Sequence, residues 1–596
     1  MAPVGRVIGQ SCADSDLAVR KTTTLAFRRI SMRDRMLFLA MAALSWIALG
    51  EPALAQQVSD TVAPGAVERS LERRLPQVGE DRVNIPPPQG FEAPPGAGDI
   101  RFVLRRVELA GATAIPEHDL ARAYASLIGK DVSLADVFRA ARAITDLYAS
   151  AGYALSFAVV PAQAVDKASG VVRVEVVEGY VAEVSFTGPA PAAARAYAAR
   201  LRRSRPLRTA DLERYLLLMD DLPGVTARSV FKRLENAPAG ATGLVIQAVP
   251  RPLSASADLH NRGSSAFGPW RTDGMLGLNS PLGLGEGLEL RAVRALDGNE
   301  LTYLAGKATV PIGGDGLSLA LNLAHTDAHP GTPLLAQAAF QSSGWTASAA
   351  LTYPVRRSRA QSLWLWSGVS IKRLHSEIVA TPNSQDRLFL LQAGSTWTGR
   401  DATGATAADL TLSQGLAAFD ATTATSPLRS RSAGSGQFTS LSADITRLQR
   451  LGGGFDLFLA GSGQIASRGL LSPERCGFGG AAFGRGFDDS EIAGDSCLMG
   501  SAELRFTPLA RPPAGAGTLS QLQLFTVFDA GMVRRLGALQ PREHRGAGAR
   551  SAGLGARVNL GSAVDASLEW DKPIGRDVAL EGSRAGRVFL RLEARY

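Results

Sequence analysis

The residues with the most distinctive chemistry lie in a glycine-rich stretch between Cys476 and Cys497. Its central residues are Gly484, Arg485, Gly486 and Phe487. A single arginine on a glycine-rich turn can be no more than a solvated cation. An arginine enclosed by protein needs an acidic partner, because an unpaired buried charge is strongly destabilising. The run therefore predicts an ionic contact only if the rest of the chain builds an enclosed space around it.

The cysteine pair points to an oxidising compartment. The chain has three cysteines, and Cys12 lies within the N-terminal signal sequence described below. Cys476 and Cys497 are then the remaining pair of an exported chain, for which a disulfide is the expected state. Such a bond would close a loop of about 20 residues and contribute about 3 kcal/mol in the chain-entropy model. Two reduced cysteines in an extracellular loop are the alternative.

No catalytic or metal-binding pattern is visible in the sequence. It contains neither a phosphate-binding loop nor a nucleophile elbow, and Gly477-Phe478-Gly479 precedes no βαβ pattern. The six histidines are scattered. His325 and His329 have a spacing that metal ligands can use, but they end a predicted strand at a turn, which favours an ordinary loop pair over a metal site. We therefore expect no enzyme activity, cofactor, metal ion or nucleotide.

The N-terminus predicts export from the cytoplasm. Four arginines between Arg28 and Arg35 precede the apolar stretch 36–49, and Ala53-Leu54-Ala55 is followed by Gln56. These features are typical of a signal peptide over residues 1–55, cleaved between Ala55 and Gln56. A transmembrane anchor is the weaker alternative, because an apolar core of about 14 residues is short for a membrane span. The long leader suggests that translation starts at Met32 or Met36.

Composition leaves one class of membrane protein open. The 596 residues are 45% hydrophobic and 20% charged, and the mean hydropathy is +0.03. After the signal sequence no apolar run is long enough for a membrane helix. A β-barrel remains possible, because its strands alternate lipid-facing and lumen-facing residues. Seven basic and four acidic residues lie within 1–55, so the net charge falls from +9 to +6, which offers no basic tract for nucleic acid.

The mature chain divides into four further segments. Residues 56–75 contain Val67, Leu71 and Leu75 at helical spacing, which predicts a short amphipathic helix after Pro64. Six prolines between Pro76 and Pro95 make 76–100 a semi-rigid linker. Residues 101–180 and 181–252, two compact modules described next, together make the third segment. Residues 253–596 form the fourth segment.

The two modules share one predicted order of elements. In 101–180, a strand ending at Gly111 precedes a helix from Pro116 to Leu127. A capping box at Ser133-Leu134-Ala135-Asp136 then opens a second helix, and two alternating strands follow, at 153–159 and 172–176. The order β-α-α-β-β recurs in 181–252, with helices near 191–203 and 212–219. The chain therefore carries two copies of one α+β unit.

From residue 253 onwards, helical periodicity gives way to strict alternation. The C-terminal strand is the clearest case. Val588, Leu590, Leu592, Ala594 and Tyr596 share one face, and Phe589, Arg591, Glu593 and Arg595 share the other. About 340 residues at about 21 per strand and turn predict a transmembrane antiparallel β-barrel of about 16 strands. A soluble β-sandwich is the alternative, but it would be unusually long.

These patterns together resemble a known superfamily. The module order, with Tyr148 to Tyr153 and Leu222-Pro223-Gly224, resembles the POTRA modules found in the periplasm before certain outer-membrane barrels. Gly484-Arg485-Gly486-Phe487 resembles the V-R-G-[F/Y] signature on the sixth extracellular loop of TpsB transporters of two-partner secretion and their BamA-like relatives. Further matches occur in family order at Asn279 to Gly283, Tyr353 to Arg356, Gly463-Gln464, Gly494-Asp495 and Glu503-Leu504-Arg505. Gly484 in place of Val or Ile, and the cysteine pair, depart from the family pattern.

The resemblance implies roles for single residues. In the superfamily the loop folds into the lumen and its arginine pairs with an aspartate of a strand motif F-x-D-x-G. Val527-Phe528-Asp529-Ala530-Gly531 matches this motif at Asp529 and Gly531, so Asp529 is the expected partner of Arg485. The aromatic C-terminus, Tyr596, resembles the signal by which the barrel assembly machinery recognises outer-membrane barrels.

A function also follows from the resemblance. The chain would be an outer-membrane pore of a Gram-negative bacterium, surrounded by outer-membrane lipid, that exports a large unfolded TpsA-type haemolysin or adhesin. Its POTRA modules would recognise the secretion domain of that partner, and the helix in 56–75 would plug the resting pore. A BamA-like assembly factor is the alternative, although two modules are fewer than the five typical of BamA. A passive porin would need neither modules nor the arginine loop.

Overall fold

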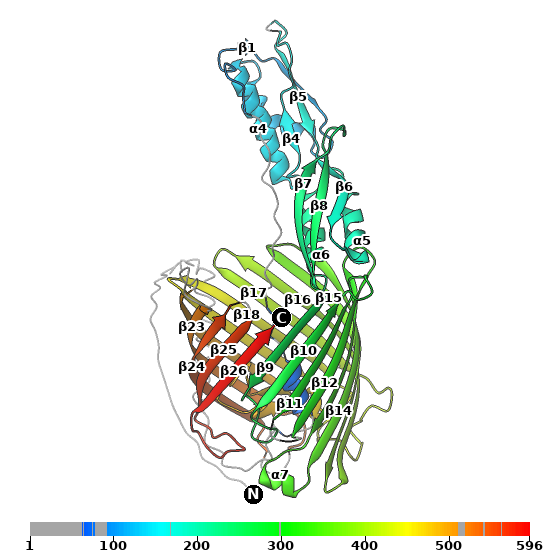
Figure 1. Cartoon of the computed structure of the whole chain (residues 1–596), viewed down its shortest axis with the longest axis vertical. Coiled ribbons are helices and arrows are strands. Elements are labelled where there is room, and N and C mark those ends of the chain that lie inside the picture. Colours follow the sequence, from blue (N-terminus) through cyan, green and yellow to red (C-terminus); the bar gives the residue numbers. More distant parts are fainter. Residues whose placement is uncertain are drawn as a thin grey trace, which may run out of the picture. The chain divides into compact units, whose positions relative to one another are not determined.

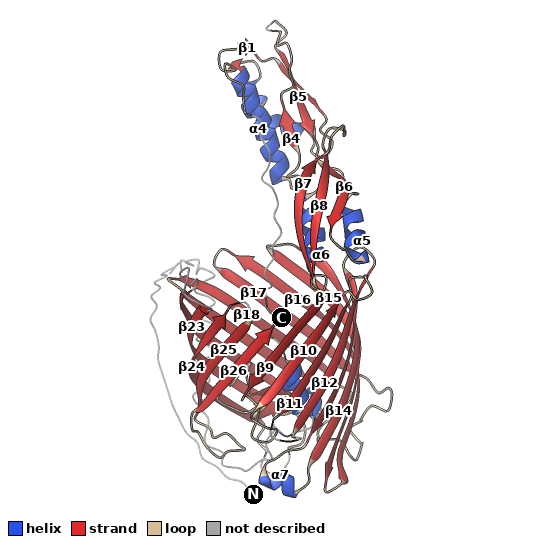
Figure 2. Ribbon diagram, in the orientation of Figure 1, coloured by secondary structure: helices blue, strands red, loops and turns tan. Residues whose placement is uncertain are grey.

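The computed structural model describes Val62 and residues 65–73, 75–77, 92–166, 168–296, 298, 300–509, 519–539, 543–561 and 563–596. The signal sequence expected over 1–55, with its cleavage site at Ala55 and Gln56, lies outside these residues, as does most of the linker 76–100. Two α+β modules precede a β-barrel along the chain (Figures 1 and 2). No helix in the described part of the chain has the length and apolar character needed to cross a membrane, a finding that does not concern β-barrels.

The first module is built around the helix α4 (Leu134–Ser150). Its predicted capping box is present: the Ser133 hydroxyl accepts from the Asp136 N–H, and Asp136 Oδ2 accepts from the Ser133 N–H at 2.7 Å. One face of α4 is buried against the strands, with Ile144 and Tyr148 both 0% exposed. The strands are β2 (Arg106–Ala110), β5 (Val171–Val177) and β4 (Phe157–Val159), in the order β2-β5-β4 with β2 parallel to β5.

Three local predictions for this module need correction. The helix predicted from Pro116 to Leu127 is a single α-turn, α3 (Glu117–Leu120), followed by the 3₁₀ turns η2 (Ala121–Ala123) and η3 (Ala125–Leu127). The chain leaves helical geometry at Tyr124, where φ is −133° while the side chain remains buried. Burial of Leu120 and Tyr124 thus reproduces a helical pattern without a continuous helix.

The other two corrections concern strands. The strand from Phe102 to Gly111 is split into β1 (Arg101–Val103), which pairs with β3 (Asp131–Ser133), and β2. The break occurs because the Leu104 and Arg105 N–H groups bond to Lys130 and Gly170 instead. The strand predicted over 153–159 starts only at Phe157, because Tyr153 packs edge-on against Tyr148 with ring centroids 6.0 Å apart.

The second module repeats the plan of the first, as predicted. It contains β6 (Tyr180–Thr187), α5 (Ala192–Leu201), α6 (Thr209–Asp220), β7 (Val225–Arg233) and β8 (Ala241–Pro250). The sheet order is β6-β8-β7, again with a parallel outer pair and an antiparallel one. In each sheet the central strand is the last strand of the module, β5 in the first and β8 in the second.

Glu178 lies where the first module joins the second, between β5 and β6. Its carboxylate accepts from the Thr113 and Ala114 N–H groups, both at 2.7 Å, and from the Tyr148 hydroxyl at 2.7 Å. Burial by itself would raise the pKa of this carboxyl, but these hydrogen bonds outweigh burial and lower the pKa below its usual range. The chain is also joined across the junction by the Thr209 N–H, which donates to the Gly152 carbonyl at 2.7 Å.

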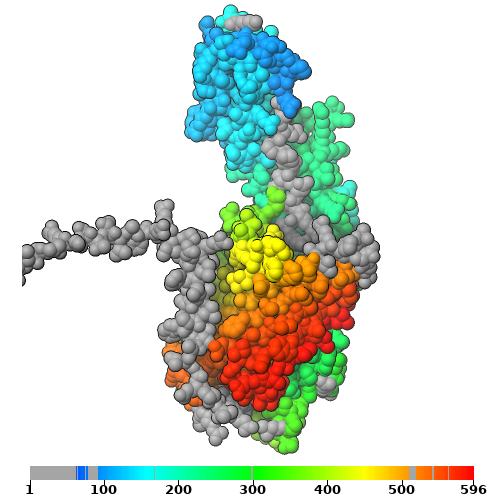
Figure 3. Space-filling view, turned by 90° about the vertical axis from the view of Figure 1, so that its left-hand side faces the viewer, coloured from blue at the N-terminus to red at the C-terminus, as the bar shows by residue number. Residues whose placement is uncertain are grey.

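The described residues of the C-terminal segment form a closed barrel of 16 antiparallel strands, which confirms the predicted fold class. The strands are β9 (Leu253–His260), β10 (Arg271–Asn279), β11 (Gly287–Ala295), β12 (Leu301–Ile312), β13 (Leu317–Ala328), β14 (Gln341–Arg357), β15 (Gln361–Ile378), β16 (Thr381–Asp401), β17 (Gly404–Gly415), β18 (Thr439–Gly452), β19 (Phe455–Ala466), β22 (Ser496–Leu509), β23 (Leu519–Arg534), β24 (Gly546–Leu560), β25 (Val564–Ile574) and β26 (Arg587–Arg595). Figure 3 shows the C-terminal strands side by side in orange and red.

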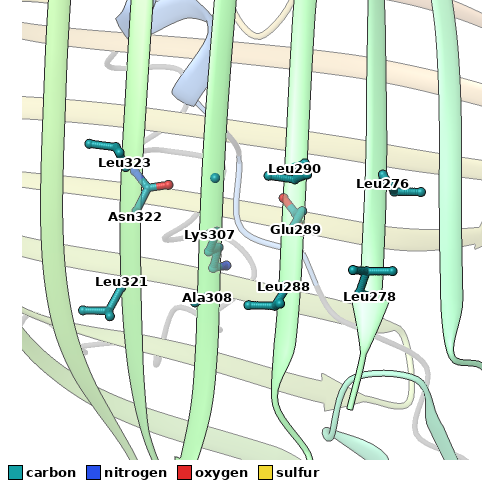
Figure 4. Close-up of a pocket in the computed structure, with 11 residues that line it drawn as sticks. Leu276, Leu278, Leu288, Glu289, Leu290, Lys307, Ala308, Leu321, Asn322 and Leu323 are labelled. Carbon is teal, nitrogen blue, oxygen red and sulfur yellow. The ribbon is translucent and has the colours of Figure 1, made fainter. Parts of the chain in front are cut away.

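The period-two pattern separates the two faces of the barrel wall. Leu288 and Leu290 of β11 are 40% and 59% exposed on the outer face, and leucines of the neighbouring strands lie beside them (Figure 4). Glu289 alternates with these leucines and is paired with Lys307 of β12 in the strand register. Arg291 shares the face of Glu289 and bonds to a helix inside the barrel, so this face lines the lumen.

The second module contacts the barrel through ion pairs and backbone hydrogen bonds. Arg357, at the end of β14, makes a two-pronged contact with Asp221 at 2.8 and 2.7 Å. The N–H groups of Ala192 and Ala193, at the start of α5, donate to the Gly283 and Leu284 carbonyls at 2.8 and 3.1 Å. These carbonyls belong to the turn between β10 and β11, so α5 begins at the rim of the barrel.

Candidate functional site in the barrel lumen

The arginine motif lies on a long loop that folds against the inner face of the barrel. The loop joins β19 to β22 and contains the hairpin β20 (Cys476–Phe478) and β21 (Ile492–Gly494). Phe478, Phe483 and Phe487 are at most 2% exposed and pack in one cluster with Met499, Val533 and Ala549 of the wall strands. The three aromatic side chains thus anchor the loop inside the lumen.

Arg485 is enclosed and paired with acidic groups, but not in the expected way. Only 8% of the residue is exposed, and its Nη1 lies 2.6 Å from Glu503 Oε2 and 3.3 Å from Glu569 Oε1. Asp529 accepts from the backbone N–H of Arg485 at 2.9 Å. Among the described residues no ion pair joins the Arg485 guanidinium to Asp529. The longer glutamate side chains reach the guanidinium, while the aspartate stops at the backbone of the loop.

Glu503 is the centre of the ionic cluster. It is 0% exposed and also accepts from Arg505 Nε at 2.6 Å and from Arg557 Nη1 and Nη2 at 2.6 and 3.0 Å. Three guanidinium groups therefore surround one carboxylate. The rings of Phe458 and Phe525 lie beneath the Arg505 and Arg557 guanidiniums, at 4.3 and 3.9 Å from the ring centroids. Removing one member of such a cluster leaves uncompensated buried charge.

The loop also bridges the strands on both sides of the barrel closure. Asp488 accepts from Arg587 of β26 at 2.8 Å, and Asp489 lies 3.9 Å from Arg271 of β10. The closing strands β26 and β9 are themselves paired over only five residues, from Arg591 to Arg595. Loop contacts thus reinforce the shortest strand pairing of the barrel.

Glycines are required where the loop meets the wall. A Cβ on Gly486 would lie 2.9 Å from the Pro573 nitrogen of β25, so the loop backbone can approach the wall this closely only without a side chain. Gly484 has φ of +80°, and a Cβ there would lie 2.5 Å from the Phe478 ring. A Cβ on Gly531 would meet the same ring at 2.2 Å. Phe478 therefore fills the space that a family Val at position 484 would need.

The remaining predicted residues are placed as follows. Cys476 and Cys497 form a disulfide that joins the hairpin strand β20 to the wall strand β22. Tyr596 follows the end of β26, is 86% exposed, and donates its N–H to the Ala255 carbonyl at 2.9 Å. Its role as an assembly signal stays a prediction.

A short helix lies inside the barrel. α2 (Ala66–Glu72) has seven residues and begins at Gly65, which has φ of +79° (Figure 1, in blue behind β10–β12). It is shorter than predicted, because Leu75 lies beyond its end and packs against the phenylalanine cluster of the loop. The side chain of Val67 is outside the described part of the structure.

The contacts of α2 reach opposite sides of the wall. Arg291 of β11 donates to the Leu71 carbonyl at 2.7 Å. Arg73 donates to Ser462 Oγ of β19 at 2.8 Å and to the Gly477 carbonyl at 3.1 Å, and it lies over the Phe483 ring at 4.8 Å. Strands β11 and β19 are eight positions apart in the ring of 16 strands. The segment from α2 to Arg73 therefore crosses the lumen.

Sequence reasoning missed several members of the cluster. Glu503 and Arg505 were noticed only as a family match, and Glu569, Arg557 and Arg262 were not noticed. Arg262 pairs with Glu569 and lies 3.8 Å from Asp571. All of these except Arg262 occupy barrel strands, and charged residues at lumen-facing positions of predicted strands are the signal that could have found them.

Family models match most of the described chain. A model described as POTRA domain, ShlB-type, matches residues 102–179, and one described as haemolysin secretion/activation protein ShlB/FhaC/HecB matches residues 240–558, more than half of the chain.

Two curated relatives are similar over shorter stretches. The heme/hemopexin transporter protein HuxB of Haemophilus influenzae (strain 86-028NP) is 25% identical over 275 residues, which cover 44% of this chain and 47% of HuxB. The outer membrane transporter CdiB of Escherichia coli O6:K15:H31 (strain 536 / UPEC) is 25% identical over 201 residues, 33% of each chain. The chain thus spans less than half the length of these relatives.

Solved structures show the same fold. CdiB from Escherichia coli matches with a TM-score of 0.68 at 18% identity, over 96% of this chain and 100% of that one. CdiB from Acinetobacter baumannii matches with a TM-score of 0.60 at 14% identity, over 95% and 97%. Together with the family models, the barrel and the paired modules show that the chain belongs to the ShlB/FhaC/HecB family of TpsB-type transporters, which lie in the outer membrane of Gram-negative bacteria with POTRA domains in the periplasm.

Proposed function

We propose that this protein exports a large partner polypeptide, of TpsA type, from the periplasm to the cell surface through the barrel lumen. The observation that carries the proposal is the α2 segment, which crosses the lumen between β11 and β19 and is held there by non-covalent contacts. If the pore were permanently blocked, no separate helix would be needed to block it. HuxB and CdiB, by their names, are transporters, which agrees with this function.

The helix has the properties expected of a removable plug. Seven residues are too few for a helix to be stable alone in water, so its order depends on contacts with the lumen. Two contacts of the helix and the chain after it are single hydrogen bonds to backbone carbonyls, from Arg291 to Leu71 and from Thr446 to Pro76. An incoming polypeptide can replace such bonds with its own carbonyl groups at little net cost in free energy.

The modules offer edges at which a partner could be captured. Within the described residues, β6 and β7 of the second module each pair only with β8, and β2 and β4 of the first module pair only with β5. An extended segment of the secretion domain could add to one of these edges as a further strand or lie in a groove beside it. The modules would thereby hold the partner unfolded below the pore.

The loop between β19 and β22 and the folding of the partner outside the cell have the remaining roles in export. The cluster of Arg485, Glu503 and Glu569 would hold the loop in the position that transport requires. Export would be driven without nucleotide, because folding of the partner outside the cell withdraws unfolded chain from the pore and shifts the equilibrium outward.

The test is to delete the gene and compare the proteins outside the cell with those of the parent strain. The expected result is loss of one large polypeptide from the surface or the medium, restored by the wild-type gene and not by Arg485→Ala. Unchanged external proteins would contradict export. A general fall in many outer-membrane barrels would favour the assembly-factor alternative.

A further inference from the structure

Six exposed arginines follow one another closely along the chain in the second POTRA module, on α5 and just after it. We call this group the arginine surface. It consists of Arg195 and Arg200 on α5 and of Arg202, Arg203, Arg205 and Arg208 on the segment that leads to α6, and all six are exposed. Six like charges within 14 residues concentrate positive charge in this part of the module.

None of these arginines is neutralised within the described part of the chain. Arg195 donates to the Ala190 carbonyl at 3.0 Å and Arg205 to the Arg202 carbonyl at 3.3 Å, and no carboxylate lies within ion-pair distance of any of the six. The acidic groups nearby are otherwise engaged: Asp211 accepts from the Ser204 hydroxyl at 2.7 Å, and Glu213 pairs with Arg359 of the barrel at 2.9 Å. Glu183 on β6 is the exposed carboxylate on the adjoining strand.

The arginine surface borders a groove and an open strand edge. A polar groove of ≈ 430 Å³ lies at the junction of the modules, lined by Arg205 and Arg208 and by Thr113 and Tyr153 of the first module. The Arg205 guanidinium also lies over the ring of Tyr180, the first residue of the edge strand β6, at 4.4 Å. A polypeptide lying along β6 would therefore pass beside Arg205 and reach the groove that Arg205 and Arg208 line.

We propose that the arginine surface binds an acidic segment of the exported polypeptide and guides it along β6 into the groove between the modules. This inference rests on the proposed export function and gives the partner a chemical character: a stretch rich in aspartate or glutamate. Attraction of this kind acts mainly on the rate of capture and on the choice of partner.

Membrane phospholipid is the other anion available in the periplasm, and the geometry argues against it. The start of α5 contacts the barrel rim at Gly283 and Leu284, whereas five of the six arginines lie at or beyond its last turn. Gly314, in the next turn of the rim, lies beside Ala196 in the middle of α5, whereas Arg205 and Arg208 line the groove at the junction of the modules, so a polypeptide in that groove fits these cations better than lipid does.

The test measures binding of a labelled oligo-glutamate peptide to the full-length purified protein in detergent. The variant carries Arg202→Glu, Arg203→Glu and Arg205→Glu. The matched control carries Arg228→Glu, Lys232→Glu and Arg233→Glu on β7, which changes the charge of the same module equally at its other edge. We expect the first variant to bind about tenfold more weakly or worse at low salt, and the control to bind like the wild type. A version with three Arg→Lys changes should retain binding.

Several outcomes would overturn the proposal. It fails if the wild type does not bind the peptide, or if both glutamate variants weaken binding equally. It fails as well if the variant loses binding to phosphatidylglycerol vesicles and not to the peptide. Export is measured in the same strains: intact export by the first variant would remove the arginine surface from the pathway and leave the export function standing. Absence of export by the wild type would instead contradict the proposed function.

Discussion

The loop between β19 and β22 and the helix α2 both lie inside the barrel, yet they are attached in different ways. The loop is bonded covalently through Cys476 and Cys497, paired as the hairpin β20–β21, and anchored by three buried phenylalanines. The α2 segment has no covalent link to the wall and is held by side-chain hydrogen bonds, among them those of Arg73 and Arg291, and by packing of Leu71 against apolar residues of the barrel.

This difference indicates that the loop stays in the lumen and that α2 is the part able to leave it. Separating the loop from the wall would expose the Glu503 cluster and the phenylalanines together, so its contacts are lost jointly or not at all. The contacts of α2 involve no covalent bond and are divided between the loop and separate strands of the wall. Arg73 connects the two regions, because it bonds to the Gly477 carbonyl and lies over Phe483, both in the loop.

The largest effect is expected for Arg485→Ala. The change leaves Glu503 and Glu569 without this guanidinium, and breaking a buried ionic pair typically costs about 3–5 kcal/mol. Export should be abolished while a heat-modifiable barrel remains in the membrane, as measured by gel mobility and by the amount of exported partner. Arg447→Ala is the control, because Asp401, its ion-pair partner, is 53% exposed and such pairs contribute little. Full export by Arg485→Ala would remove the assigned role of the loop.

Deleting residues 59–75 should produce the next largest effect. The barrel would lose the segment that crosses its lumen, so ion conductance in planar bilayers should rise. Arg73→Ala should act in the same direction, raising the open fraction by about tenfold, because two hydrogen bonds to the wall and loop are lost. Gln77→Ala, at an exposed position, is the control. Unchanged conductance after the deletion would argue against a plug.

Replacing both cysteines by serine should loosen the loop without opening the pore. The bond closes a loop of sequence separation 21, and its loss should cost about 3 kcal/mol in the chain-entropy model. Faster proteolytic cleavage between 476 and 497, with unchanged conductance, is the expected result. Mass spectrometry of non-reduced peptides provides the direct check, and two free thiols in the wild type would exclude the disulfide.

Gly484→Val, which restores the usual family residue, should have the smallest effect. A β-branched side chain at φ of +80° is strained by about 1–2 kcal/mol, and its Cβ would clash with Phe478. We expect moderately reduced export and a lower unfolding temperature of the barrel. Gly500→Ala, where a Cβ would have 3.9 Å of clearance, should be neutral. If the Val variant behaves like the wild type, Phe478 is free to move and the loop is less rigid than its packing indicates.

Elements with a short sequence period were predictable. The capping box at Ser133 and the alternation of β26 depend on residues two or three positions apart, so each is visible without knowledge of the fold. Where a residue is buried by distant parts of the chain, the local pattern predicts the wrong secondary structure. Leu120 and Tyr124 are buried by α4 and the strands in successive short turns, although their spacing is helical.

The candidate site was predictable only in part, for the same reason. The family motif located Arg485 and placed Asp529 near it, and the structure brings the two into contact through the backbone. Which carboxylate meets the guanidinium depends on side-chain length across three different strands. No pattern within one strand reports that distance.

The sequence by itself determined the order of the described parts, two repeated modules and a barrel of alternating strands, because each follows from local periodicity and composition. Only the tertiary structure decided that three arginines bond to Glu503 and that Phe478 occupies the space beside Gly484 and Gly531. It also decided that α2 crosses the lumen between β11 and β19. Apart from Glu503–Arg505 and Phe478–Gly484, these contacts join residues tens to hundreds of positions apart, and closure of the barrel is what brings them within bonding distance.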